Sequence, residues 1–387
     1  MPTHSSSVRD LLVSTKLKAV LQDHKAVVVL KDSATVEQAL AVLAGNRILS
    51  APVVAPSAGS SAGARSFEAN AAFQDIVCCL DLRDVLCSFL EELDVPAVKD
   101  MKMLRRMKEL EEKGGQFAVR AIKTLPILGK RSLRSCSDGA FYLESGVESM
   151  SVLELVHDGL LYPREARKAI AGGSRTRTVV HRIALYDRQI RITHIISQSD
   201  IARFLLEHRE RLGDLGDATV ESLGWAAQAV ITVTPETPAV VALALMAEKG
   251  ISGLGVVNAR GLLIANFSIS DLRTIVAEHF GAMALPVGEF LALEHGTEFW
   301  GVDRAELQTK PASMFASNRE LRRRESAGCQ VGQALVLATA QETFSEVLEK
   351  LVANRLHRLY VVDTELRPVG IVTLTDILRT VTQQSVG

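Results

Sequence analysis

The chain has 387 residues, of which 47% are hydrophobic, 23% charged and 5% aromatic, a length that accommodates two or three domains. The formal net charge of −1 gives no overall attraction to nucleic acid or to an anionic membrane. No apolar run reaches the roughly 18 residues of a membrane span, and the first residues lack the features of a secretory signal.

The five cysteines show no CxxC spacing, so we expect reduced, mostly core cysteines in an intracellular protein. The catalytic signatures we sought do not occur: no phosphate-binding GxxxxGK[ST] loop, no GxGxxG after a strand, no HExxH and no GxSxG. The nine histidines and five cysteines form no metal-ligand cluster in the sequence. We therefore predict no catalytic residues, no metal and no enzymatic activity.

The first predicted unit lies within residues 8–96. Strands are expected at 50–54 and 76–80, joined by an Ala-, Ser- and Gly-rich stretch over 55–72 that is typical of a flexible hairpin tip. The segment 81–84 then starts a helix. An earlier helix is indicated by apolar residues at i, i+3, i+4 and i+7, which are Val36, Ala39, Leu40 and Leu43.

A charged helical stretch follows within a linker over residues 97–140. Residues 99–134 hold eleven Lys or Arg against four acids. At helical spacing such a run forms either a solvated face or a docking surface for an acidic partner, and both interpretations stay open. Met101, Met103 and Met107 suggest an adaptable apolar strip on that helix.

The second unit, residues 141–211, has two predicted strands at 181–186 and 191–196. Ser197 and Asp200 follow the second strand. The first helix of this unit is expected to be disturbed by Gly172-Gly173 and the SRTRT stretch behind it. A short linker over 212–224 separates this half of the chain from the next.

The third unit occupies residues 225–281 and ends with Ser268 and Asp271 after its second strand. Residues 282–332 form a long connection that carries the basic run Arg319 to Arg324, and we expect part of it to be ordered or docked on a partner.

The fourth unit, residues 333–387, is the clearest copy. Strands are predicted at 359–362 and 369–372, before Thr373 and Asp376. The order is helix, strand, turn, strand, helix, as in the other units, so the chain contains an internal repeat. Its first helix has its apolar residues at Phe344, Val347, Leu348 and Leu351.

The repeat resembles the CBS (cystathionine-beta-synthase-type) repeat, which pairs into two-repeat Bateman modules. The segments HRIALYD and HRLYVVD, with ITHIISQSDI and VGIVTLTDIL, resemble the gamma regulatory subunit of AMP-activated and sucrose-non-fermenting-related protein kinases, most closely the plant-type stand-alone branch. The resemblance covers nearly the whole chain apart from the linkers. It implies an α/β fold of four CBS repeats, paired into two modules that form a pseudo-symmetric disc.

The resemblance also implies a function. A gamma-type subunit binds AMP, ADP or ATP in up to four clefts and regulates a kinase catalytic subunit together with a beta-type scaffold subunit, in the cytoplasm and the nucleus. An alternative, from another class, is a CBS-domain adaptor whose nucleotide sites are degenerate and which only brings partners together.

A hydroxyl residue followed three positions later by an aspartate recurs at the end of a strand. The simple interpretation is helix capping. The functional one adds ribose binding, because an ionised carboxylate offers two acceptor oxygens to a pair of adjacent hydroxyls. The resemblance implies this second role for Asp200, Asp271 and Asp376, with supporting polar residues at Ser197, Ser268, Thr373 and Thr343.

Two His-Arg pairs, His181-Arg182 and His357-Arg358, stand at the same place in repeats 2 and 4. They could be ordinary exposed polar residues. Their coincidence favours phosphate binding, because Arg supplies a planar, permanently charged donor fork and His a donor whose charge varies near neutral pH. The resemblance implies that these pairs point to the centre of the disc.

Repeat 1 departs from this pattern. Asp84 is its candidate ribose residue, but Asp81 stands where the other repeats have Ser or Thr, and the two nearby carboxylates should disfavour a polyphosphate. Leu49-Ser50 in repeat 1 and Ser252-Gly253 in repeat 3 replace the His-Arg pair. We therefore expect the best-supported nucleotide site in the second module, residues 225–387.

Overall fold

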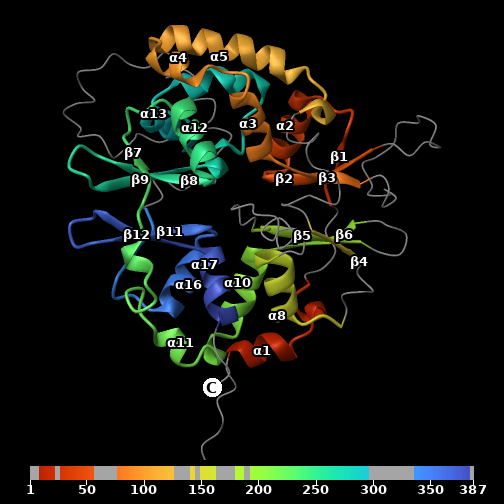
Figure 1. The fold of residues 1–387 in the computed structure, drawn as a ribbon, viewed down its shortest axis with the longest axis vertical. Coiled ribbons are helices and arrows are strands. Elements are labelled where there is room, and N and C mark those ends of the chain that lie inside the picture. Colours follow the sequence, from red (N-terminus) through yellow and green to blue (C-terminus); the bar gives the residue numbers. More distant parts are fainter. Residues whose placement is uncertain are drawn as a thin grey trace, which may run out of the picture.

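The structure, a computed structural model, describes residues 8–21, 27–55, 76–125, 140–143, 149–162, 179–186, 192–295 and 335–383. Four three-stranded sheets form a double layer across the middle of the molecule, and helices cover it above and below (Figure 1). None of the helices in these ranges is both long and apolar enough to cross a membrane. The predicted hairpin tip from residue 56 on, the Gly172-Gly173 pair and the basic run Arg319 to Arg324 lie outside these ranges.

Each sheet has the same connectivity. A short first strand pairs in parallel with the second strand, and the second pairs antiparallel with the third. A helix connects the two parallel strands, as parallel pairing requires. The sheets are β1 (Leu30–Lys31), β2 (Ser50–Val54) and β3 (Ile76–Asp81); β4 (Ala140–Leu143), β5 (Arg182–Tyr186) and β6 (Ile192–Ser197); β7 (Thr232–Val233), β8 (Gly253–Val257) and β9 (Leu263–Ser268); β10 (Leu337–Thr339), β11 (Arg358–Val362) and β12 (Pro368–Thr373).

The helices of the repeats follow the predicted order, with two corrections. The first helices are α2 (Val36–Gly45), α8 (Val152–Glu154) continued by the π-helix η4 (Leu155–Leu161), α12 (Ala239–Lys249) and α16 (Phe344–Ala353). In repeat 2 this helix ends at Leu161, before Gly172-Gly173, so the expectation that this pair disturbs it was wrong. The second helices are α3 (Leu82–Leu90), α10 (Gln198–Glu207), η7 (Ile269–Leu272) and α17 (Leu374–Gln383).

The second correction concerns repeat 3. Its second helix is a single 3-10 turn, η7, followed by the longer 3-10 helix η8 (Ala277–Ala284), instead of a regular α-helix. The remaining elements are α1 (Val8–Ser14), η1 (Leu17–Ala19), α4 (Val95–Asp100), α5 (Met103–Ala118), η3 (Ile122–Thr124), η5 (Arg209–Arg211), α11 (Asp214–Asp217), η6 (Trp225–Ala227) and α13 (Val287–His295).

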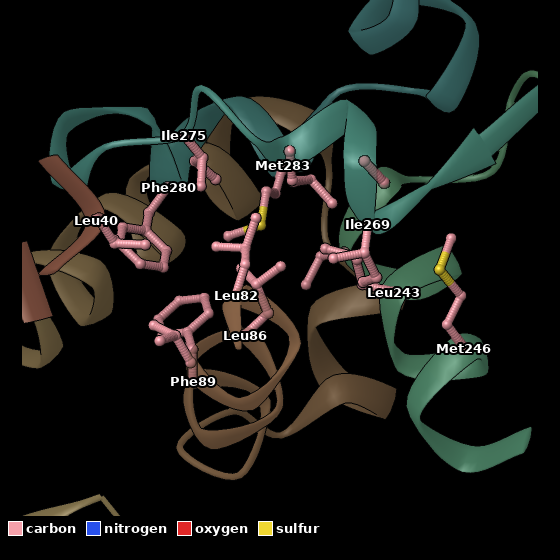
Figure 2. Close-up of a cluster of buried hydrophobic side chains, with 14 of the residues drawn as sticks. Leu40, Leu82, Leu86, Phe89, Leu243, Met246, Ile269, Ile275, Phe280 and Met283 are labelled. Carbon is pink, nitrogen blue, oxygen red and sulfur yellow. The ribbon is translucent and has the colours of Figure 1, made fainter. Parts of the chain in front are cut away.

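The four repeats contact one another in two different ways. The helices of repeats 1 and 3 share one apolar core, part of which is drawn in Figure 2, and those of repeats 2 and 4 share another. The sheets pair differently: Val29 of repeat 1 clusters with Ala184 and Ile192 of repeat 2, and Leu263 of repeat 3 clusters with Tyr360 of repeat 4. Repeats 1 and 2 therefore form the first module and repeats 3 and 4 the second, and helix contacts join the modules.

The charged linker helix α5 packs on the core that repeats 1 and 3 share, instead of standing free in solvent. Phe117 of α5 packs near Phe89 of α3 and Phe280 of η8, with ring centroids 5.4 and 6.1 Å away. The buried Arg106 guanidinium donates hydrogen bonds to four backbone carbonyls, those of Val98, Lys99, Met101 and Ala284.

The face of α5 that carries Phe117 packs against repeats 1 and 3. This face is therefore neither solvated nor open to a partner. The three methionines that suggested an apolar strip divide accordingly. Met107 is buried in the core, Met101 packs at its edge, and Met103 is exposed.

The 3-10 helix η6 at the start of repeat 3 approaches β12 closely at Gly370. A Cβ atom at this position would lie 1.9 Å from the backbone carbonyl oxygen of Trp225, and a backbone atom cannot rotate away. We expect Gly370→Ala to destabilise the protein by about 1–3 kcal/mol, as overpacking does. Gly45→Ala, where the added Cβ meets nothing within 4 Å, is the matched control and should not destabilise it. Chemical denaturation followed by circular dichroism measures both, and equal stabilities would contradict the Gly370 contact.

Candidate functional site

An aspartate at the start of the second helix of each repeat closes a capping box. Its Oδ2 atom accepts a hydrogen bond from the backbone N–H three residues earlier, at 2.7–3.1 Å. In repeats 2, 3 and 4 the hydroxyl of Ser197, Ser268 or Thr373 donates to the same oxygen. The interpretation as helix caps is confirmed, whereas ribose binding stays a prediction. The four aspartates are Asp84, Asp200, Asp271 and Asp376.

Capping occupies one carboxylate oxygen and leaves the other directed elsewhere. In repeat 2, Oδ1 of Asp200 lies 3.3 Å from Nη2 of Arg203. In repeat 4, Oδ1 of Asp376 lies 3.8 Å from Nη1 of Arg379. These pairs are partly exposed and therefore weak, so a ligand hydroxyl could compete for the oxygen.

Thr343 is the fourth predicted supporting residue, and it caps α16 through Glu346. Thr35 caps α2 in the same way. Repeat 3 has no such cap, because α12 starts after Pro238, which supplies no side-chain acceptor. In repeat 2, Ser151 caps the first helix, a position that the sequence interpretation missed.

The strand register confirms that the two His-Arg pairs occupy equivalent places. Arg182 faces Ser197 across its hairpin, and Arg358 faces Thr373. By the same register Ser50 of repeat 1 faces Asp81, and Gly253 of repeat 3 faces Ser268. A long basic residue in one repeat of each module therefore corresponds to a small residue in the other.

Both arginines use this difference in size to reach across their module. Nη1 of Arg182 donates to Oγ of Ser50 at 2.9 Å, and Nη2 of Arg358 donates to Oγ of Ser252 at 2.6 Å. A Cβ atom at Gly253 would lie 1.8 Å from Nη1 of Arg358. Glycine at 253 is thus what leaves room for the Arg358 guanidinium in the second module.

Tyr360 completes the surroundings of Arg358. Its hydroxyl donates to Oδ1 of Asn266 at 3.0 Å, which joins repeats 4 and 3. Burial raises the pKa of Tyr360 to about 12, although Arg358 opposes this shift. Burial likewise lowers the pKa of Arg358, with the charges of Tyr360 and Asp271 acting in the opposite direction. The guanidinium stays charged, because its ordinary pKa is far above neutrality.

His357 lies where the charges of several repeats converge. Although the residue is exposed, closely surrounding protein lowers the pKa of its imidazole to about 4, first by desolvation and then through Arg182, Arg358, His181 and Arg273. We call these five residues the basic cluster. The structure thus brings the other three predicted phosphate-binding residues within electrostatic reach of His357, and the four come from both modules.

Arg273 is the member of the basic cluster that the sequence interpretation missed. The positions two residues after Asp84, Asp200 and Asp376 hold Leu86, Ala202 and Leu378, all buried in the cores. In repeat 3 the corresponding residue is Arg273. It lies just after the 3-10 turn η7 and therefore outside a regular helix. Its Nε is buried without a hydrogen-bond partner among the described residues.

A separate cavity of about 270 Å³ lies beside Asp271, between α5 and the second module. Its apolar lining includes Met107, Ile275 and Phe290. Its polar lining is mostly acidic, with Asp271, Glu111, Glu278 and Glu294. Such a lining repels phosphate, so an anion is expected at the basic cluster and not here. Within the described ranges, no group of three or more His, Cys, Asp and Glu side chains could hold a metal ion.

The comparisons with known proteins agree with this architecture. The CBS domain family model matches residues 220–278 and 333–382, which cover repeats 3 and 4. A crystal structure from Methanocaldococcus jannaschii, described as a proposed archaeal homologue of gamma-AMPK, superposes with a TM-score of 0.54. It covers 95% of this chain and 99% of its own at 16% identity, a similarity that shows the fold.

Two curated relatives are similar in sequence. The 5'-AMP-activated protein kinase subunit gamma of Dictyostelium discoideum is 25% identical over 207 residues, 51% of this chain and 30% of the relative. The SNF1-related protein kinase regulatory subunit gamma-like PV42a of Arabidopsis thaliana is 26% identical over 189 residues, 48% of each chain. The matches thus span less than half the length of these relatives. Repeats 3 and 4 thus match the CBS domain model, and part of the chain is similar in sequence to the gamma regulatory subunits of these kinases.

Proposed function

We propose that the protein is a non-catalytic regulatory subunit that binds AMP, ADP or ATP and controls a Ser/Thr protein kinase. The observation that carries the proposal is the basic cluster, in which two arginines and two histidines from equivalent places, with Arg273, gather between the modules. The similarity to two kinase gamma subunits supports the choice of partner. Its partners would be the kinase catalytic subunit and a beta-type scaffold subunit, in the cytoplasm and the nucleus.

The chemistry of the cluster suits the phosphate end of a nucleotide. Arg358 and Arg182 offer guanidinium forks, which match phosphate oxygens in bidentate geometry. The neutral ring of His357 can donate one hydrogen bond and gain a proton beside an anion. Asp200, Asp271 and Asp376 would accept from ribose hydroxyls through the carboxylate oxygen that does not close the capping box.

Regulation would follow from where the cluster lies. Its residues come from repeats 2, 3 and 4, and therefore from both modules. An anion bound among them favours the arrangement that keeps these positive charges together. Only such a difference in affinity between two arrangements can transmit binding to a kinase.

One observation favours the adaptor alternative. Both arginines already have partners within the protein, Arg182 at Ser50 and Arg358 at Ser252. These contacts would have to loosen before a phosphate could take both donors of either fork. An adaptor would retain them permanently, whereas a nucleotide sensor would exchange them for the ligand.

Thermal melting with AMP, ADP and ATP in turn separates the two functions. A nucleotide at 100 times its dissociation constant stabilises the folded state by about 2.7 kcal/mol. The regulatory proposal expects a clear upward shift with at least one of them. Folded protein whose melting temperature does not change with any nucleotide would contradict nucleotide binding and support the adaptor.

Nucleotide binding should also depend on pH through His357. Its pKa of about 4, against an ordinary 6.5, leaves the ring neutral at pH 7, and a bound anion should raise that pKa. Binding then takes up a proton, so affinity increases as pH falls. If the anion restores the ordinary value, the gain between pH 7.5 and 5.5 is about tenfold. Titration calorimetry at both pH values measures it.

The matched variant for this pH dependence is His357→Gln, which keeps a donor but cannot titrate. The nucleotide itself gains a proton in this range, so the quantity of interest is the difference between the two proteins. Equal pH dependence in wild type and His357→Gln would show that the ring does not contact the anion.

A further inference from the structure

The first module differs from the second in having a carboxylate, Asp81, at the end of its third strand, where the other repeats have Ser or Thr. Oδ2 of Asp81 lies 3.5 Å from Nη1 of Arg182, and both side chains are partly exposed, with 25% and 28% of their surface accessible. The same Nη1 donates to Ser50. Arg182 therefore bridges from repeat 2 to both residues of the pair that faces it in repeat 1.

Asp81 also has a structural role, which fixes the position of its charge. Its Oδ1 accepts a hydrogen bond from the backbone N–H of Arg83 at 2.9 Å and caps α3. The carboxylate is thus held by the helix on one side, while Oδ2 faces Arg182. A charge placed in this way loses little conformational freedom when it pairs with the arginine.

The second module lacks such an internal anion at the equivalent place. The register that pairs Ser50 with Asp81 pairs Gly253 with Ser268. Arg358 donates to the neutral hydroxyl of Ser252, and the nearest equivalent of Asp81 is the neutral Ser268. Repeats 2 and 4 also have a hydroxyl residue there, Ser197 and Thr373.

We infer that Asp81 acts as a built-in substitute for phosphate that occupies Arg182 and prevents the first module from binding a nucleotide. The inference rests on the proposed function and narrows it. The fork of Arg182 is taken by Asp81, so the phosphate contacts fall to Arg358 and His357 in the second module. A phosphate approaching Arg182 must displace a carboxylate held 3.5 Å away and then remain beside that negative charge. Like charges at such a distance oppose binding strongly.

The direct test replaces the substitute anion. Asp81→Ser reproduces the residue found in repeats 2 and 3, and serine can still cap α3. Titration calorimetry with AMP, and separately with ATP, should show one more binding site than in the wild type, or at least tenfold tighter binding. Asp81→Asn keeps the shape of the side chain without its charge and should act in the same direction. It provides the test if Asp81→Ser folds poorly.

The reciprocal variant is Ser268→Asp, which places a carboxylate opposite Gly253 and Arg358. It should weaken binding in the second module at least tenfold. Wild type that binds nucleotide, with Asp81→Ser and Asp81→Asn unchanged in stoichiometry and affinity, overturns this inference alone. Absence of binding in wild type and in both Asp81 variants overturns the proposed function as well, because Asp81 would not be what blocks the site.

Discussion

Replacing Phe280 by alanine should lower the free energy of unfolding by about 3–5 kcal/mol, the usual cost of truncating a buried phenylalanine. Phe280 is fully buried, and its ring centroid lies 4.5 Å from that of Phe89. Figure 2 shows the two side chains in one cluster although they belong to different repeats. The loss is large because Phe280 also contacts α5, where a Cβ atom at Gly114 would lie 2.5 Å from it. Denaturation by urea measures it.

The controls for this result come from the same region. Phe280→Leu keeps most of the volume and should cost clearly less than alanine. Leu104 lies on α5 with 63% of its surface exposed, so Leu104→Ala should change stability by no more than about 0.5 kcal/mol. Equal, small effects of Phe280→Ala and Leu104→Ala would show that the linker helix does not join the two repeats.

Replacing Asp376 by alanine should have two separable effects. It removes the capping box at Thr373, which costs about 1 kcal/mol of stability. If the carboxylate also binds ribose, the substitution weakens nucleotide binding by about two orders of magnitude. It then removes most of the stabilisation of about 2.7 kcal/mol that is expected at 100 times the dissociation constant. Melting with and without nucleotide reports both effects.

A second capping box distinguishes the two roles. Ser151 and Glu154 make the same contacts at the first helix of repeat 2, with the Ser151 N–H donating to Glu154 at 2.7 Å. Glu154→Ala should cost a similar stability and leave the nucleotide shift intact. An Asp376→Ala protein that melts lower but shifts as much as Glu154→Ala would reduce Asp376 to a cap.

The repeat could be predicted because its signals are local, whereas the pairing of the repeats was an implication of the family resemblance. Phe344, Val347, Leu348 and Leu351 recur at helical spacing, and all four are at most 1% exposed. The Ser/Thr-x-x-Asp pattern requires only the geometry of one helix turn, and every copy forms the expected cap. Strands of two or three residues, such as β1 and β7, lack the length that a periodic pattern needs, and they were missed.

The features of the candidate site that were missed depend on distant parts of the chain. Arg182 and Asp81 are 101 positions apart, and only the pairing of two sheets brings them to 3.5 Å. Arg273 belongs to the basic cluster and follows η7, the short 3-10 turn that replaces the expected helix. No residue pattern in the sequence indicated this replacement. The burial of α5 likewise depends on η8, more than 160 residues later along the chain.

The alternation of sheet and helix contacts closes the four repeats into a ring. Each repeat has two different neighbours, one through its sheet and one through its helices. An open stack of repeats needs special end units with a polar outer face, whereas a ring has no ends. Loss of any one repeat would therefore expose apolar surface on both of its neighbours. A repeat that binds nothing is still required, so its ligand-contacting residues can change while its architecture cannot.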